Sequence, residues 1–186
     1  REVVQVISKG TVMNGDLLDE KNNNYIGNVM DFKHCFVVSY ADISTGELSL
    51  FITEHDLSKL ISEIISIGIQ EIIINDDCDK ALIEILRNKY KVTVSVYNES
   101  DNLKEYEKLY QSINDIRYIE TVKHLLTYLN ETQKRSLSHL KEVQIRDNKD
   151  YLKMDIHTKR NLELTENIRL KSRNFSLLWL LDKTKT

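Results

Sequence analysis

The sequence predicts a mixed α/β fold for about its first 100 residues and a mostly helical region after residue 115. Three observations predict this order. Between residues 24 and 52, runs of β-branched and aromatic side chains alternate with short turn segments, as in antiparallel strands. From Leu57 the apolar residues recur every three or four positions, as in an amphipathic helix. Two short apolar runs, Glu71–Asn75 and Val92–Tyr97, then alternate with helical stretches, which is typical of buried parallel strands.

Turn-forming residues join the early strand candidates. Strands are expected at Asn24–Met30, Cys35–Asp42 and Glu47–Ile52. Ile43–Gly46 separates the last two, and its Ser, Thr and Gly suit a tight hairpin connection. The Val- and Ile-rich residues 3–7 predict a further strand that enters the domain, and Asn14-Gly15 predicts a turn after it.

Two amphipathic helices are expected between the later strands. The apolar stripe of the first is Leu57, Leu60, Ile61, Ile64 and Ile65. Glu54-His55-Asp56 supplies cap candidates before it, and Gly68 is expected to end it. Asp76-Asp77 would cap the second helix, whose stripe is Ala81, Leu82, Ile85 and Leu86. Three antiparallel strands followed by α-β-α-β is the order of a ribonuclease-H-like sheet, which is the fold we expect for residues 15–100.

A linker and a long helix are expected next. Residues 101–114 are polar and rich in Asn, Glu and Lys, which is typical of a linker. A helix is then expected from near Asp115 to Thr132, with the start of a separate helical body at residues 115–186. Its apolar face would be Ile119, Val122, Leu126 and Leu129.

Three further signals lie in the last part of the chain. Val143–Ile145 and Tyr151–Met154 predict a β-hairpin across the turn-forming Asp147-Asn148. Asp155 is expected to cap a short helix. Phe175–Leu181 is apolar, so we expect it to fold back or to be covered by a contact, because exposed apolar patches rarely stay bare.

Composition and charge exclude several classes of protein. Apolar residues make up 41% and charged residues 30% of the chain, which is a globular balance. The net charge of −3 gives no overall positive field for nucleic-acid phosphates. Cys35 and Cys78 have no His or Cys at ligand spacing, so we expect two buried thiols rather than a zinc site or a disulfide. No apolar run approaches the roughly 18 residues that span a bilayer, so we expect a soluble, cytoplasmic protein.

The carboxylates permit two interpretations. In a metal-dependent ribonuclease-H-like nuclease, Asp42 would hold metal ions together with other carboxylates. The candidates for that role are Glu47, Glu63, Asp76 and Asp77. In the simpler interpretation, Asp42 starts a turn by accepting a backbone hydrogen bond and Asp76-Asp77 caps a helix. We favour the second interpretation, because no spacing forces the carboxylates together.

The other reactive groups give weaker signals. Cys35 with His34 or His55 is a candidate nucleophilic pair, but neighbours on a strand point to opposite faces. We expect surface or packing roles for the remaining histidines, His124, His139 and His157. We expect solvated faces or salt bridges at the basic groups, Lys134-Arg135, Lys159-Arg160 and Arg169 to Arg173. No Gly-x-x-x-x-Gly-Lys phosphate loop occurs, so no ATP site of that kind is expected in this chain.

Several segments resemble the MutS family of DNA mismatch-repair ATPases. Asp42–Leu48 resembles the hairpin of the family's connector domain, and residues 1–14 resemble the strand that enters it from the mismatch-recognition domain. Three later segments resemble the opening of the family's core domain: Thr132–Leu140, Met154–Leu164 and Ser176–Thr186. The chain begins without Met and stops within the last of these, so we expect a fragment that covers the connector and the start of the core (lever) domain.

The resemblance also implies a function. In the family, the connector links mismatch recognition to the lever helices, transmits nucleotide state and offers a surface to MutL, the next repair protein. The whole protein would be a homodimer that binds mismatched double-stranded DNA and hydrolyses ATP with Mg²⁺ at a distant site. For this chain the resemblance implies no catalytic, cofactor or metal site. Four positions are expected to face MutL: Lys59, Glu63, Glu84 and Lys89. A ribonuclease-H-like nuclease and a free-standing helical interaction module are the alternatives.

Overall fold

The computed structural model describes residues 24–101, 103–133, 137–146, 154 and 156–182. The chain divides into two compact units, Arg1–Asp147 and Asn148–Thr186. The strand expected at residues 3–7 and the turn expected at Asn14-Gly15 lie outside the described residues.

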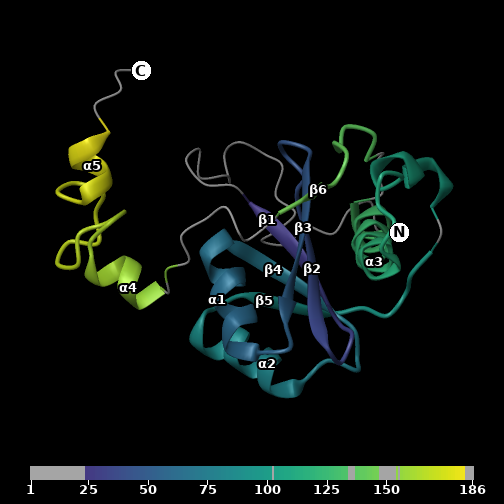
Figure 1. Cartoon of the computed structure of the whole chain (residues 1–186), viewed down its shortest axis with the longest axis horizontal. Coiled ribbons are helices and arrows are strands. Elements are labelled where there is room, and N and C mark those ends of the chain that lie inside the picture. The colour runs from purple at the N-terminus through teal and green to yellow at the C-terminus, as the bar shows by residue number, and fades with distance from the viewer. Residues whose placement is uncertain (1–23, 102, 134–136, 147–153, 155, 183–186) are drawn as a thin grey trace, which may run out of the picture. The chain divides into compact units, whose positions relative to one another are not determined.

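A six-stranded mixed sheet forms the centre of the first unit (Figure 1). Its strands are β1 (Tyr25–Asp31), β2 (Cys35–Asp42), β3 (Glu47–Glu54), β4 (Ile69–Ile74), β5 (Thr93–Val96) and β6 (Gln144–Ile145). Their order across the sheet is β5-β4-β1-β2-β3-β6. β2 runs antiparallel to β1 and β3, whereas the β1–β4, β4–β5 and β3–β6 pairs are parallel. The mixed α/β fold and the first five strands agree with the sequence patterns.

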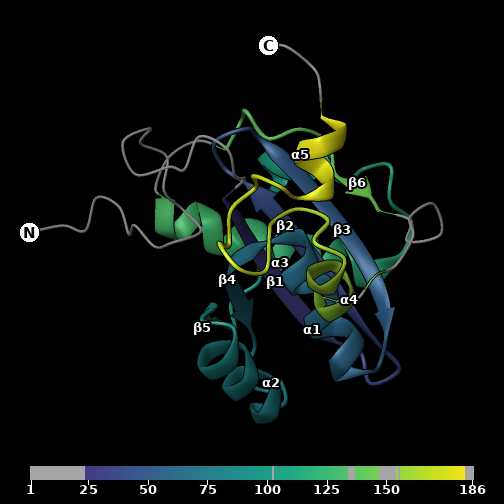
Figure 2. The same cartoon turned by 90° about the vertical axis from the view of Figure 1, so that its left-hand side faces the viewer.

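One face of the sheet is covered by α1 (Leu57–Ile67), α2 (Lys80–Glu84) and the π-helical turn η3 (Ile85–Lys89) (Figure 2). Asp56 caps α1 by accepting hydrogen bonds from the main-chain N–H groups of the next turn, and Gly68 ends it with φ +85°. Both roles were expected from the sequence. The cap predicted for α2, Asp76-Asp77, was wrong. Asp79 accepts the hydrogen bond from Ala81 N–H instead.

The opposite face of the sheet is covered by the 3-10 turn η4 (Lys104–Leu109) and by α3 (Ile116–Gln133). The long helix lies where its apolar spacing placed it. The structure differs from the expectation of a polar linker at residues 101–114 and a separate body after it, because this segment packs in the core of the first unit. Its buried side chains are Tyr106, Leu109, Tyr110 and Ile113. All eight residues of β2 are buried, so the sheet needs a cover on both faces, and this segment supplies the second cover.

The residues after α3 also belong to the first unit. Leu137, Leu140 and Val143 are buried in the same core, and β6 pairs with β3. We expected Val143–Ile145 to form a β-hairpin with Tyr151–Met154. In the described residues, β6 pairs with β3 instead. Most of the second hairpin strand lies outside the described residues.

The two outer strands of the sheet are protected differently. At the β5 edge, Arg87 Nη2 donates a hydrogen bond to the Val94 main-chain oxygen at 2.6 Å. At the other edge, β6 has only two residues. The hydrogen bond from Arg87 occupies the Val94 main-chain oxygen, an acceptor that the β5 edge would otherwise expose.

In the part of the second unit that the structure describes, the helices are α4 (Ile156–Asn161) and α5 (Leu177–Leu181). Main-chain hydrogen bonds from Leu177 to Glu163 and from Leu178 to Leu164, each 2.9 Å, connect the start of α5 to the residues that follow α4. The cap expected at Asp155 lies outside the described residues. Within the described residues the apolar run is largely exposed, including Phe175 at 66% and Leu181 at 70%. The expectation that a contact covers this run stays a prediction.

Candidate functional site

A stripe of hydrogen-bonding groups holds α3 against the sheet. Arg117, Thr121, His124 and Tyr128 are spaced at i, i+4, i+7 and i+11, which places them on one face of a helix. Beside this polar stripe lie four buried apolar side chains, Val122, Leu125, Leu126 and Leu129. Burying the apolar side chains favours packing in any orientation, whereas each hydrogen bond specifies a direction.

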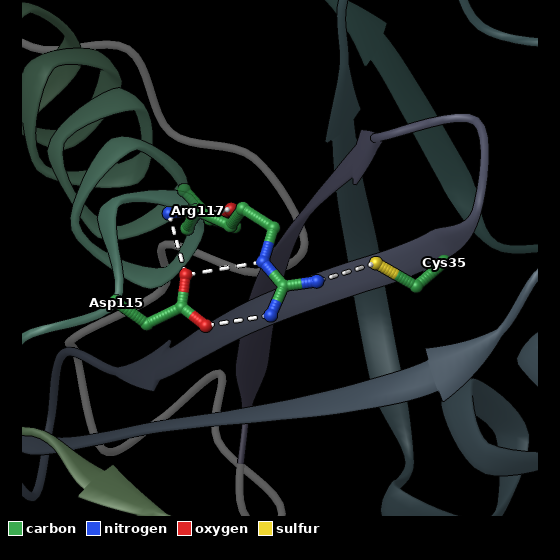
Figure 3. A network of polar contacts seen from close by, with 4 residues as sticks. Cys35, Asp115 and Arg117 are labelled. Atoms are coloured by element: carbon green, nitrogen blue, oxygen red, sulfur yellow. Dashed lines mark hydrogen bonds and ion pairs between the residues drawn. The ribbon is translucent and has the colours of Figure 1, made fainter.

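The first contact of the polar stripe lies at the start of α3 (Figure 3). Asp115 accepts hydrogen bonds from Arg117 Nε at 3.1 Å and Nη2 at 2.6 Å, and also from the Arg117 main-chain N–H. Arg117 Nη1 points the other way and donates to Cys35 Sγ of β2 at 3.4 Å. The hydrogen bonds from Arg117 lower the pKa of Asp115, so both groups are charged at neutral pH. The fixed guanidinium therefore connects the first turn of α3 to the start of β2.

The middle of the polar stripe is fully buried. The Thr121 main-chain oxygen accepts hydrogen bonds from Asn28 Nδ2 at 2.9 Å and Ser39 Oγ at 3.1 Å. One turn later, His124 Nε2 donates to the Tyr97 main-chain oxygen at 2.9 Å, and Nδ1 lies 2.9 Å from Asn28 Oδ1. Asn28 and Ser39 are 0% exposed and His124 is 2% exposed. Burial lowers the pKa of His124, and the hydrogen bond to Tyr97 opposes that shift.

The last contact of the polar stripe joins α3 to β4. Tyr128 Oη donates to Glu71 Oε1 at 3.2 Å, and the same oxygen accepts from Ser95 Oγ at 3.3 Å. Glu71 is 0% exposed, although it is a carboxylate. Burial raises the pKa of Tyr128, so its hydroxyl keeps the proton that it donates. From one end to the other, α3 thus bonds to β2, β1, the residue after β5, and β4.

The sequence pattern did not single out this stripe. We expected His124 to have a surface or packing role, and its hydrogen bonds to two other segments were missed. A partial signal was present in the spacing of Arg117, His124 and Tyr128 on the face that also carries the apolar residues, whereas Thr121 bonds to the sheet through its main-chain oxygen. An amphipathic helix usually keeps such side chains on its outer face, so their position inside indicated a directional contact.

The carboxylate of Asp42 shapes the turn between β2 and β3. Its Oδ1 accepts from Ser44 N–H at 2.8 Å and Ser44 Oγ at 2.5 Å, and its Oδ2 from Asn24 N–H at 3.3 Å. The turn role expected from the sequence is confirmed. Among the described residues, no group of three or more His, Cys, Asp or Glu side chains is arranged to hold a metal ion. The nuclease interpretation therefore has no support from this part of the chain.

The cysteine and histidine candidates are engaged in packing. Cys35 contacts Arg117, whereas His55 stacks on Phe36 with ring centroids 4.4 Å apart and lies 3.1 Å from the Asp31 carboxylate. No hydrogen bond joins Cys35 to His34 or His55 in the described residues. Both cysteines are free and buried, as expected. Of the candidate basic groups, Arg160, Arg169 and Arg173 are exposed, and Arg173 pairs with Asp182. Lys134-Arg135 lies outside the described residues.

The four residues expected to face a partner lie on the helices that cover the first face of the sheet. Lys59 and Glu63 are on α1, and Glu84 and Lys89 are on α2 and η3. Lys59, Glu84 and Lys89 are exposed, whereas Glu63 is half-buried. Lys59 forms an ion pair with Glu54 at 2.5 Å, and Lys89 lies 5.3 Å from the centre of the Tyr90 ring. Their partner role stays a prediction.

The described helices give no sign of a membrane span, since none of them is both long and apolar enough to cross a bilayer.

Comparison with known proteins gives a consistent result. A family model described as MutS domain II matches residues 24–141. Proteins named DNA mismatch repair protein MutS are 44% identical in Bacillus pumilus (strain SAFR-032), 42% in Staphylococcus carnosus (strain TM300) and 41% in Bacillus subtilis (strain 168). In each case the alignment covers 100% of this chain and 21% of the relative. The chain thus spans about one fifth of the length of these relatives.

Proposed function

The chain belongs to the MutS family of DNA mismatch repair proteins, and we propose that it acts there as a connector that couples mismatch binding to a distant ATPase. The observation that carries the proposal is the polar stripe, which bonds α3 to β1, β2 and β4 and to the residue after β5. Directional bonds in a close-packed core give the helix one orientation. The sheet and α3 would then move as one rigid body, and a rigid body passes on displacements that a flexible linker loses.

We extend the proposal to the fold of the connector, to the start of the core domain and to the whole protein. The run of three antiparallel strands followed by α1, β4, α2 and β5 supports a ribonuclease-H-like connector. The helices α4 and α5 would begin the core (lever) domain. Mismatched double-stranded DNA, a homodimer, ATP with Mg²⁺ and a cytoplasmic location are proposed for the whole protein. The 186 residues hold no Gly-x-x-x-x-Gly-Lys loop, so ATP would be bound outside them.

The coupling role can be tested in the full-length protein with Asn28→Ala and His124→Ala. Each variant removes hydrogen bonds from the polar stripe while leaving the surface of the unit unchanged. We expect the change in ATP turnover on adding mismatched DNA to shrink, whereas mismatch affinity and turnover without DNA stay at wild-type values. Asn88→Ala and His34→Ala are matched controls at exposed positions. If the stripe variants respond to mismatched DNA as the controls do, α3 docking does not carry the coupling.

We also propose that the outer faces of α1 and α2 bind MutL. The support is the position of Lys59, Glu84 and Lys89, which are exposed on helices whose apolar sides are used by the sheet. Charge reversal at Lys59, Glu63, Glu84 and Lys89 should weaken MutL binding in a pull-down or interferometry assay. Reversal of Glu105 and Lys108, exposed residues of η4 on the opposite side of the sheet, is the control. Equal binding by both sets of variants would place the contact elsewhere.

We propose that this part of the protein has no catalytic activity of its own. The support is the arrangement of Asp42, whose two oxygens serve the turn and Asn24. Incubation of the chain with Mg²⁺ and single- or double-stranded nucleic acid should give no cleavage. Cleavage that requires Mg²⁺ and disappears in Asp42→Asn would restore the nuclease alternative.

A further inference from the structure

The residues after α3 are fastened to the hairpin between β2 and β3. We call residues 137–146 the exit segment, because they are the last described residues before the second unit begins at Asn148. We call Ile43–Gly46 the β2–β3 turn. The exit segment passes this turn first and then pairs with β3.

Four hydrogen bonds fix the exit segment at separate points. Lys141 N–H donates to the Gly46 oxygen at 2.8 Å, and His139 Nε2 donates to the Ile43 oxygen at 2.8 Å. Further along, Val143 N–H donates to the Leu109 oxygen and Arg146 N–H to the Leu50 oxygen, each at 2.8 Å. Three of these bonds are made by main-chain N–H groups, so they depend on the path of the backbone rather than on side-chain identity.

Gly46 leaves no room for a side chain beside the exit segment. Its φ of +73° is a conformation that side-chain-bearing residues rarely adopt. A Cβ at this position would lie 2.5 Å from the His139 main-chain oxygen. The neighbouring atom is backbone, so the main chain of the turn or of the exit segment would have to shift. Asp42, which is 1% exposed, holds the other side of the turn through its bonds to Ser44.

We propose that the β2–β3 turn is a clasp that fixes the path by which the chain leaves the first unit, with Gly46 and His139 as positioning residues for the coupling. The inference rests on the proposed function, since it names the place where a movement of the sheet is passed to the following chain. Every later residue is joined to the first unit through the exit segment. An exit segment that is hydrogen-bonded to the sheet moves with it, whereas an unbonded segment would change conformation and would not pass the movement on.

The test uses the full-length protein with Gly46→Ala, His139→Ala and His139→Gln. Gly68→Ala is a matched control, because Gly68 also has positive φ, +85°, but an added Cβ there meets nothing within 4 Å. It therefore brings a similar backbone strain without touching the exit segment. His139→Gln retains an amide N–H that can donate to the Ile43 oxygen, so it should restore part of what His139→Ala loses.

Two measurements separate the clasp from the coupling. In hydrogen exchange followed by mass spectrometry, Gly46→Ala and His139→Ala should speed exchange in peptides covering 137–146 by about tenfold or more, because exchange follows local opening. Peptides from β1 and β2 should keep wild-type rates. The mismatch-dependent change in ATP turnover should fall in the same two variants and be retained in Gly68→Ala and largely in His139→Gln.

Each outcome has a distinct meaning. Unchanged exchange in the exit segment would overturn the clasp itself. Faster exchange with full mismatch response would show that the clasp exists but does not position the coupling, which overturns the inference and leaves the proposed function intact. If wild-type protein and all variants alike show no mismatch-dependent turnover, the proposed function fails instead. If Gly46→Ala does not fold, the comparison of His139→Ala with His139→Gln decides between these outcomes.

Discussion

The His124 ring is buried between the main-chain oxygen of Tyr97 and the side-chain oxygen of Asn28. Two effects act on its protonation in opposite directions. Burial disfavours the protonated ring. The two carbonyl acceptors favour it, because only the protonated ring can donate from both nitrogens. Burial is the larger effect, and the pKa of His124 is lowered. A residue that the sequence pattern assigned to surface or packing thereby becomes a source of pH dependence.

The first prediction follows from the sign of that shift. An unfolded chain has an ordinary His pKa near 6.5 and binds a proton that the folded state resists, so acidification favours unfolding. The stabilising contribution should be present above about pH 6.5 and lost as the pH falls through the folded pKa. Urea unfolding at pH 7.5, 6.5 and 5.5 should show this loss in the wild type and less of it in His124→Asn. The exposed His34→Gln is the control. A His124 pKa above 6.5 by NMR titration would show that the two acceptors outweigh burial.

At the scale of elements, α3 shows what a repeat of apolar residues can reveal. The spacing of Ile119, Val122, Leu126 and Leu129 predicted the helix within a residue or two of Ile116–Gln133. It did not reveal the partner, because periodicity shows which face is apolar and not which surface covers it. The helix was therefore assigned to a separate body. The turn motif at Asp42–Glu47 was predictable because its residues act on their own backbone.

The second prediction measures how much the packing of α3 contributes. Leu126 is 1% exposed within the core that joins α3 to the sheet. Leu126→Ala should lower the free energy of unfolding by about 2–5 kcal/mol, through lost transfer energy and the cavity left behind. Ile116→Ala, on the same helix but 62% exposed, should change it by less than about 0.5 kcal/mol. Urea denaturation followed by circular dichroism compares the two. Equal effects would mean that α3 does not pack on the sheet as described.

For the whole molecule, the sequence predicted the class of fold correctly but not the residue at which the first folded unit ends. Strands and helices up to residue 100 depend on local patterns, and those patterns were clear. The polar character of residues 101–114 hid three buried side chains: Tyr106, which lies between Glu105 and Glu107, and the pair Leu109-Tyr110, which follows Lys108. The site was less predictable than the fold, because the polar stripe brings together residues up to 96 positions apart. The spacing along α3 shows which of its polar side chains face inward, but it does not show which distant residues they contact.

The third prediction concerns the extent of the folding unit. A chain ending at residue 100 keeps every residue of the first five strands but loses α3 and η4, so one face of the sheet would be bare. We expect it to be insoluble or to unfold without a cooperative transition, whereas a chain of residues 24–147 should unfold cooperatively in urea. Two-dimensional NMR of both proteins checks this. A well-dispersed spectrum from the shorter chain would show that residues 101–147 are dispensable for folding.

The guanidinium of Arg87 has a consequence for how copies of the protein behave at high concentration. An unprotected strand edge can recruit another chain and grow into fibrils, and Arg87 occupies the Val94 oxygen that would begin such pairing. Arg87→Ala should leave the monomer folded but shorten the lag before thioflavin-positive aggregates form under mild heating. Lys89→Ala, two residues away and also exposed, should keep the wild-type lag. In this view, one hydrogen bond at the border of the sheet helps to keep a chain rich in β-branched strands colloidally stable.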